Sequence, residues 1–115
     1  MTKPQRNVLI TGASSGIGKA TAQLLLLHGW KVIAAARRTD EMTDLCASGA
    51  EIFPLDITDI QSRQSLVTHV HEQFGVLDAL VNNAGFGEVG PIETMPIQSA
   101  QSLFEVNVFG LIGLT

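Results

Sequence analysis

Glycine and serine residues near the start of the chain form a segment that could bind phosphate. Residues 11–18 read Thr-Gly-Ala-Ser-Ser-Gly-Ile-Gly and directly follow the apolar run 8–10. This pattern predicts a buried strand that turns into a helix, because three glycines in the turn let the backbone approach a phosphate or the strand closely, while the helix N-terminus offers unpaired N–H groups. A simple strand-to-helix turn needs fewer glycines. The predicted dinucleotide-binding residues here are Gly12, Ser14, Ser15, Gly16, Ile17 and Gly18.

Two arginines follow the second predicted strand and bear on the choice of dinucleotide. The strand over 31–36 ends at Ala36, and Arg37 and Arg38 come next. A site selective for NAD places an acid at this position, where it binds the ribose 2′-hydroxyl. A guanidinium group instead binds a 2′-phosphate through paired hydrogen bonds. The pattern favours NADP over NAD, and the alternative is a solvated pair of arginines.

Three further motifs carry carboxylate or amide groups. Asp56 and Ile57 follow the third predicted strand, the run Asn-Asn-Ala-Gly at 82–85 follows the fourth, and Asn107 lies in an apolar stretch near the chain end. Asp56 could instead cap a helix or be solvated. Asn107 could simply face another helix, although asparagine is disfavoured in the middle of a helix because its side chain competes for backbone groups.

Taken together, these motifs and their order resemble the short-chain dehydrogenase/reductase family, in its common single-domain form, over residues 7–115. The resemblance implies that Asp56 binds the adenine amine and that the Ile57 N–H lies at the ring. It implies that the segment containing Asn83, Ala84 and Gly85 braces the sheet along the cofactor ribose. It also implies that Asn107 is one of four catalytic residues and holds a water molecule in the proton relay.

The resemblance also implies an activity, for which this sequence carries only part of the machinery. Family members transfer hydride between a nicotinamide and a carbonyl or alcohol substrate, using a serine and a tyrosine placed three residues before a lysine. The sequence contains no tyrosine, and its last lysine is Lys31. We therefore expect residues 1–115 to form a dinucleotide-binding domain that is incomplete at its C-terminus and inactive alone.

Two function classes follow from this expectation. In the first, the chain represents an oxidoreductase whose other half lies outside these residues. In the second, it is a non-catalytic nucleotide-binding or interaction fragment. The glycine spacing of 11–18 argues against a third class, the extended sugar-nucleotide epimerases.

Apolar periodicity predicts an alternation of strands and helices. The strands are expected at 7–11, 31–36, 51–55 and 77–82, and the helices at 17–28, 41–48, from 58 or 59 to 74, and 94–115. Such alternation predicts an α/β fold, a Rossmann-type parallel sheet with helices on both faces, in the strand order 3-2-1-4. This is the first half of a doubly wound fold. The third of these helices is expected to turn Leu66, Val67, Val70 and Phe74 toward the sheet.

Composition limits the remaining function classes. The chain has 115 residues, a net charge of −4 and a single cysteine, Cys46. All acids lie from Asp40 onward, whereas residues 1–39 contain six Lys and Arg residues. This distribution suits a small polyanionic ligand, unless it is an accident of composition. The basic residues lack the aromatic interleaving typical of nucleic-acid binding, and no apolar run is long enough for a membrane span.

Cellular location and assembly are also expected from the sequence. A single cysteine fits a reducing compartment, so we expect a cytoplasmic protein. The last predicted helix is apolar nearly all round from Leu103 onward, and the strand over 77–82 is left without a further neighbour. Apolar faces and bare strand edges seek partners, which predicts a homo-oligomer.

Overall fold

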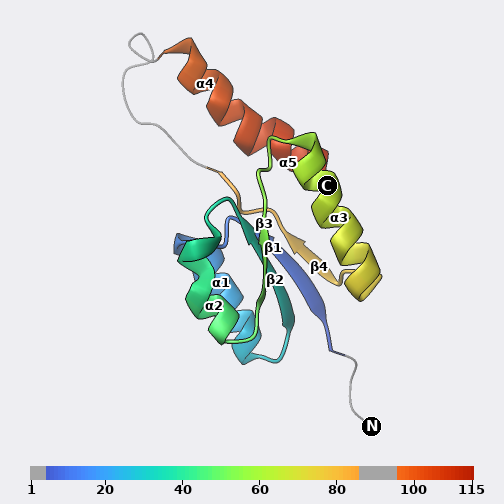
Figure 1. Ribbon diagram of the computed structural model, residues 1–115. Helices are drawn as coiled ribbons and strands as arrows, with labels where there is room; N and C mark the ends of the chain where they lie inside the picture. Colours follow the sequence, from blue (N-terminus) through green and yellow to red (C-terminus); the bar gives the residue numbers. More distant parts are fainter. Residues whose placement is uncertain (1–4, 86–95) are drawn as a thin grey trace.

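The computed structural model describes residues 5–85 and 96–115, in which four parallel strands form one sheet (Figure 1). The strands are β1 (Asn7–Thr11), β2 (Lys31–Ala36), β3 (Glu51–Pro54) and β4 (Ala79–Val81), and their order is β3-β2-β1-β4. In the register of the sheet, Val8 lies beside Val32 on one side and beside Ala79 on the other. The predicted order 3-2-1-4 is confirmed.

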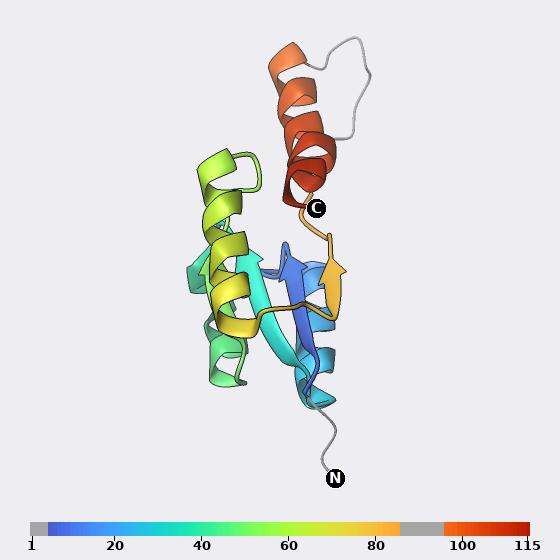
Figure 2. The ribbon, with the colours of Figure 1, turned by 90° about the vertical axis from the view of Figure 1, so that its right-hand side faces the viewer.

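Helices cover both faces of the sheet because the buried strands are apolar on both sides. The helix α1 (Gly16–Leu27), the 3₁₀ turn η1 (Thr39–Met42) and α2 (Thr43–Ala47) lie on one face, and α3 (Ile60–Phe74) lies on the other (Figures 1 and 2). Val8 and Ile10 pack under the first layer, whereas Leu9 packs under α3. This alternation is the two-residue period of a strand.

The ends of α3 follow its sequence signals closely. The Asp59 side chain caps the helix by accepting a hydrogen bond from the Gln61 N–H at 3.0 Å, and the helix ends before Gly75. Leu66 and Val70 are buried, but Val67 is 52% exposed. The expectation that Val67 faces the sheet is therefore wrong, because one residue further along a helix turns the side chain about 100° away.

The C-terminal helix is interrupted. It begins as α4 (Ile97–Phe104), widens into a π-helical segment η3 (Glu105–Gly110), and continues as α5 (Leu111–Leu114). The sequence predicted one continuous helix, with a cap at Thr94, which lies outside the described residues. Figure 1 shows α4 extending beyond the sheet, while Leu114 of α5 packs with the buried residues under α3. In the described ranges, no helix is both long and apolar enough to cross a membrane.

Candidate functional site

Thr11, the last residue of β1, ties two of the sequence motifs together. Its side chain is fully buried, and its hydroxyl oxygen accepts hydrogen bonds from the N–H groups of Asn83 and Ala84, both at 3.0 Å. The same hydroxyl donates to the Val81 carbonyl at 3.4 Å. The segment after β4 is therefore held against the start of the glycine-rich turn. We did not predict this role, although a hydroxyl at the end of an apolar strand is a readable signal.

The glycines of the turn have different tasks. The Asn83 amide donates to the Gly12 carbonyl at 3.2 Å. A Cβ on Gly12 would lie 2.9 Å from the Ala84 Cα, and one on Gly18 would lie 2.4 Å from both the Asn83 Nδ2 and the Gly12 oxygen. Gly12 and Gly18 thus serve close packing of protein against protein. Gly16 has open space around it, but its φ of +58° favours glycine.

A cavity of about 350 Å³ lies next to this turn, at the carboxyl ends of β1 and β2. Nine of the predicted residues line it, namely Gly12, Ser14, Ser15, Arg37, Arg38, Asp56, Ile57, Ala84 and Gly85. Its lining also includes five residues that the sequence did not single out for binding, namely Ala35, Ala36, Glu41, Leu55 and Val106. Gly16, Ile17, Gly18, Asn83 and Asn107 are outside that lining. The cavity has the position where open α/β sheets bind ligands.

The start of α1 faces this cavity with its serines. Ser15 is the N-cap residue of α1, and its side chain makes no hydrogen bond to the helix backbone. Ser14 and Ser15 both line the cavity, and Ile17 is exposed. A helix N-terminus whose cap hydroxyl is not engaged by the helix offers N–H and O–H donors to an anion.

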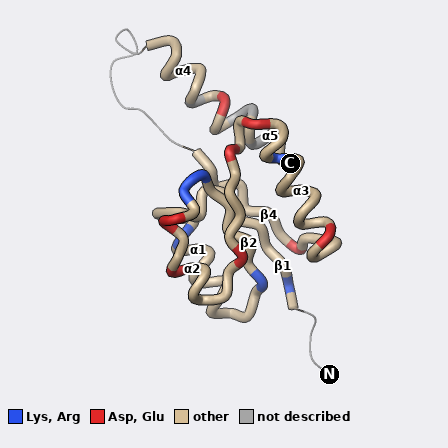
Figure 3. The backbone as a smooth tube through the Cα atoms, viewed as in Figure 1, with Lys and Arg blue, Asp and Glu red and all other residues tan. Residues whose placement is uncertain are grey.

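Basic and acidic residues meet at the end of β2 (Figure 3). Arg37 and Arg38 are exposed and line the cavity. The Arg38 Nη1 lies 3.2 Å from the Glu41 Oε1, forming an ion pair on the cavity wall. Lys19 of α1 donates to the Glu41 carbonyl at 3.2 Å and pairs with Asp44 at 3.0 Å, which lowers the pKa of Asp44. The segment that carries Glu41 is thereby tied to α1.

Asp56 forms the cavity wall beyond β3. Its Oδ1 accepts hydrogen bonds from the Thr58 hydroxyl at 2.6 Å and the Thr58 N–H at 3.1 Å. The hydroxyl contact lowers the pKa of Asp56 most, the backbone contact adds to it, and the Arg37 charge lowers it further, so the carboxylate is ionised near neutral pH. The alternative that Asp56 caps a helix is wrong, because Asp59 caps α3.

The π-helical segment brings Asn107 toward the cavity. A Cβ on Gly85 would lie 2.5 Å from the Asn107 Oδ1, and Val106 lines the cavity. The Ile57 side chain is buried, and its carbonyl accepts a hydrogen bond from Arg63 at 2.7 Å. π-helical turns often occur at functional sites, because they re-aim side chains that a regular helix would point elsewhere. In the described part of the chain, His, Cys, Asp and Glu form no group suited to a metal ion.

Comparison with known proteins identifies the family. The family model described as short chain dehydrogenase matches residues 6–115. The chain belongs to the short-chain dehydrogenase family. Serine 3-dehydrogenase of Rhizobium radiobacter is 37% identical over 112 residues, which cover 94% of this chain and 45% of that protein. A dehydrogenase/reductase SDR family protein 7-like of Anopheles gambiae is 40% identical, and the match covers all of this chain and 42% of that protein.

Solved structures of short-chain dehydrogenases share this architecture. One from Streptomyces avermitilis has a TM-score of 0.94 and 39% identity, with 99% of this chain and 43% of that chain covered. An alcohol dehydrogenase from Thermococcus sibiricus, complexed with 5-hydroxy-NADP, has a TM-score of 0.89 and 30% identity, with 96% and 50% covered. This short-chain dehydrogenase chain thus spans about half the length of the relatives it matches.

Proposed function

We propose that this chain forms the cofactor-binding half of an NADP-dependent oxidoreductase that acts on a carbonyl or alcohol substrate. The observation that carries the proposal is the pair Arg37 and Arg38 on the cavity wall, directly after the uncharged end of β2 at Ala36. An acid at the end of this strand would repel a 2′-phosphate, whereas two guanidinium groups attract it. The related alcohol dehydrogenase bound to 5-hydroxy-NADP supports the same choice.

The described residues fit such a cofactor at several points. The N-terminus of α1, with Ser14 and Ser15, would hold the pyrophosphate, and the ionised Asp56 would accept a hydrogen bond from the adenine amine. Gly12 and Ala84 both line the cavity, and their close contact fixes the turn against the segment after β4. When bound, the nicotinamide group would supply or accept the hydride.

The chemistry of the proposed reaction assigns a role to Asn107. In the family that this chain belongs to, such an asparagine positions a water molecule for the proton relay, and the amide here lies beside Gly85 at the edge of the cavity.

The relatives named above are dehydrogenases or reductases, which does not favour the non-catalytic alternative. The proposed setting is a cytoplasmic homo-oligomer. The exposed apolar side chains Ile97, Phe104 and Ile112 support the assembly.

Competitive titration of NADPH and NADH into the purified chain tests the cofactor proposal. A charge-assisted hydrogen bond contributes about 1.5–3 kcal/mol, so NADPH should bind roughly tenfold to a hundredfold more tightly. Arg37→Ala should remove most of this preference, while Lys31→Ala, at the opposite end of β2, should leave it intact. Equal affinities in the unmodified chain would refute the proposal.

The same preparation tests the expected lack of turnover. The chain contains no tyrosine to act as the general acid, a role that typically contributes about 10²–10⁴-fold to the rate. We therefore propose that it oxidises no NADPH when mixed with a panel of aldehydes and ketones. Oxidation that persists in the pure chain and disappears in an Asn107→Ala variant would contradict this proposal.

A further inference from the structure

Glu41 places a carboxylate on the wall of the cavity that both arginines line. Its Oε1 lies 3.2 Å from the Arg38 Nη1, in an ion pair whose side chains are 74% exposed for Arg38 and 41% exposed for Glu41. An anion that enters the cavity can reach this pair, because neither side chain is enclosed. One of the two guanidinium groups that would attract a 2′-phosphate, that of Arg38, is therefore already paired with an internal anion.

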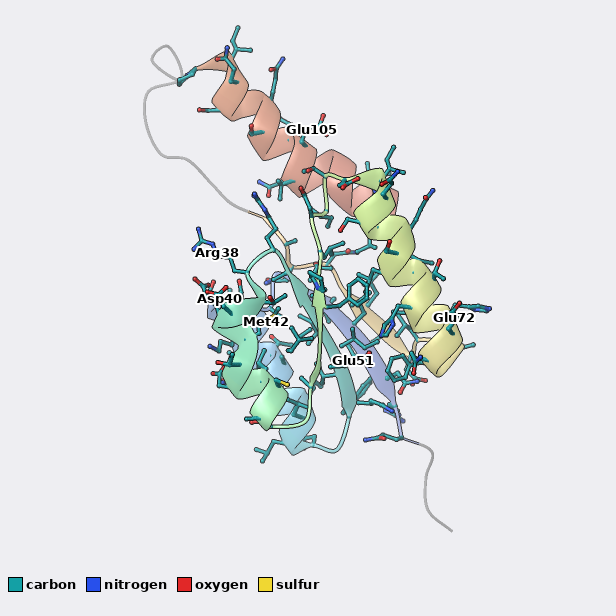
Figure 4. The ribbon with its side chains drawn as sticks, in the orientation of Figure 1. Arg38, Asp40, Met42, Glu51, Glu72 and Glu105 are labelled. Carbon is teal, nitrogen blue, oxygen red and sulfur yellow. The ribbon has the colours of Figure 1, made fainter. Side chains whose placement is uncertain are left out.

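The position of Glu41 is set by three contacts of its backbone and its neighbour. The Glu41 N–H donates to the Arg38 carbonyl at 3.3 Å, and the Lys19 Nζ donates to the Glu41 carbonyl at 3.2 Å. The next residue, Met42, is fully buried beneath this segment. Figure 4 shows Arg38, Asp40 and Met42 within this short stretch between β2 and α2. These contacts hold the backbone of Glu41 beside the cavity that its side chain lines.

Each arginine of the cavity has an acid close by. Arg38 pairs with Glu41, and the Arg37 charge acts on the Asp56 carboxylate. The positive potential available to a ligand phosphate is therefore smaller than the count of two arginines indicates, because opposite charges nearby cancel part of their field.

We propose that Glu41 is a specificity-determining residue that weakens binding of the 2′-phosphate. The carboxylate competes with the phosphate for Arg38 and also repels it as a like charge. This inference rests on the proposed binding of NADP. The Glu41 carboxylate makes the preference for NADP smaller than Arg37 and Arg38 would produce alone. Removing this carboxylate should therefore increase, and not decrease, the affinity for a ligand with a 2′-phosphate.

Two probes that differ only in the 2′-phosphate isolate this effect, namely adenosine 2′,5′-bisphosphate and adenosine 5′-monophosphate. Glu41→Gln should tighten binding of the bisphosphate by about threefold to tenfold, as expected for removing an exposed ion pair and a like charge. Its affinity for the monophosphate should stay within about twofold. The gain should shrink at about 0.5 M salt, because screening reaches its full effect at exposed charges.

Matched variants separate this role from a general effect of charge or folding. Asp40→Asn removes the same charge one residue earlier, from an exposed side chain outside the cavity lining, and should change the bisphosphate affinity by less than about twofold. Glu41→Asp keeps the carboxylate and should bind like the unmodified chain. In an Arg38→Gln background, the part of the gain that comes from competition for Arg38 should disappear, and only the part that comes from like-charge repulsion should remain. Circular dichroism is the control that each variant is folded.

The outcomes distinguish this inference from the cofactor proposal. If Glu41→Gln changes the bisphosphate affinity no more than Asp40→Asn does, the inference is wrong. It is equally wrong if the substitution weakens the monophosphate, because Glu41 would then hold a ribose hydroxyl as the acid of an NAD site. If the unmodified chain shows no preference for the bisphosphate but Glu41→Gln creates one, the inference holds and the proposed NADP preference fails.

Discussion

Replacing Thr11 by valine should release the segment after β4 from the glycine-rich turn. Valine has the shape of threonine but cannot accept hydrogen bonds, so the N–H groups of Asn83 and Ala84 would each lose a partner now at 3.0 Å. An unsatisfied buried donor costs about 1–3 kcal/mol, and these two amides are partly buried, so we take the lower end for each. The expected loss is about 2 kcal/mol of unfolding free energy.

Thr11→Ser is the matched control for this substitution. Serine keeps the hydroxyl and loses one buried methyl group, which costs about 1 kcal/mol. For a domain of this size, 2 kcal/mol corresponds to a drop of roughly 8 °C in the melting temperature, measured by circular dichroism. Stability alone separates the two variants only modestly, so a local measurement is needed.

Amide hydrogen exchange at Asn83 and Ala84 supplies that local measurement. Exchange at these two positions should accelerate in Thr11→Val by far more than at the strand interior, and it should remain slow in Thr11→Ser. Binding of adenosine 5′-monophosphate should weaken only in the valine variant, because Ala84 lines the cavity. Equal exchange rates in the two variants would refute the assigned role of the hydroxyl.

Two further predictions concern residues that contact the lining of the cavity from outside, Gly18 beside Gly12 and Thr58 beside Asp56. Gly18→Ala should destabilise the chain by about 1–3 kcal/mol, because its Cβ would lie 2.4 Å from the Gly12 carbonyl oxygen, and unchanged stability would show that the turn yields easily. Thr58→Val should raise the pKa of Asp56 toward its usual value of 3.8, as followed by carboxyl NMR shifts. The pKa of Asp56 is lowered in the folded chain, so ionised Asp56 stabilises the fold at pH values above 3.8, and this contribution is lost as the pH falls through the folded pKa. The unmodified chain and Thr58→Val should therefore converge in stability at low pH.

Local patterns were enough to predict the strands and most helix ends, whereas the strand order was predicted from the rule for doubly wound α/β folds. Apolar runs with glycine and proline boundaries specify buried parallel strands, and capping residues such as Asp59 specify helix starts, because both depend on neighbours in the sequence. Val67 was misplaced because helical periodicity defines a stripe of side chains whose edges only packing decides.

The residue types of the candidate site were also readable from the sequence, since glycine turns, strand-end arginines and Asp56 each imply their chemistry locally. Only the tertiary structure decided how they act together. It brought the Thr11 hydroxyl to the N–H of Asn83, 72 residues away, and placed the pair of Arg38 and Glu41, which are close in the sequence, on the cavity wall beside Asp56 and Ala84. It also opened the helix into a π-turn that sets Asn107 beside Gly85. Such contacts depend on side-chain directions and distances between elements, which no spacing along the chain encodes.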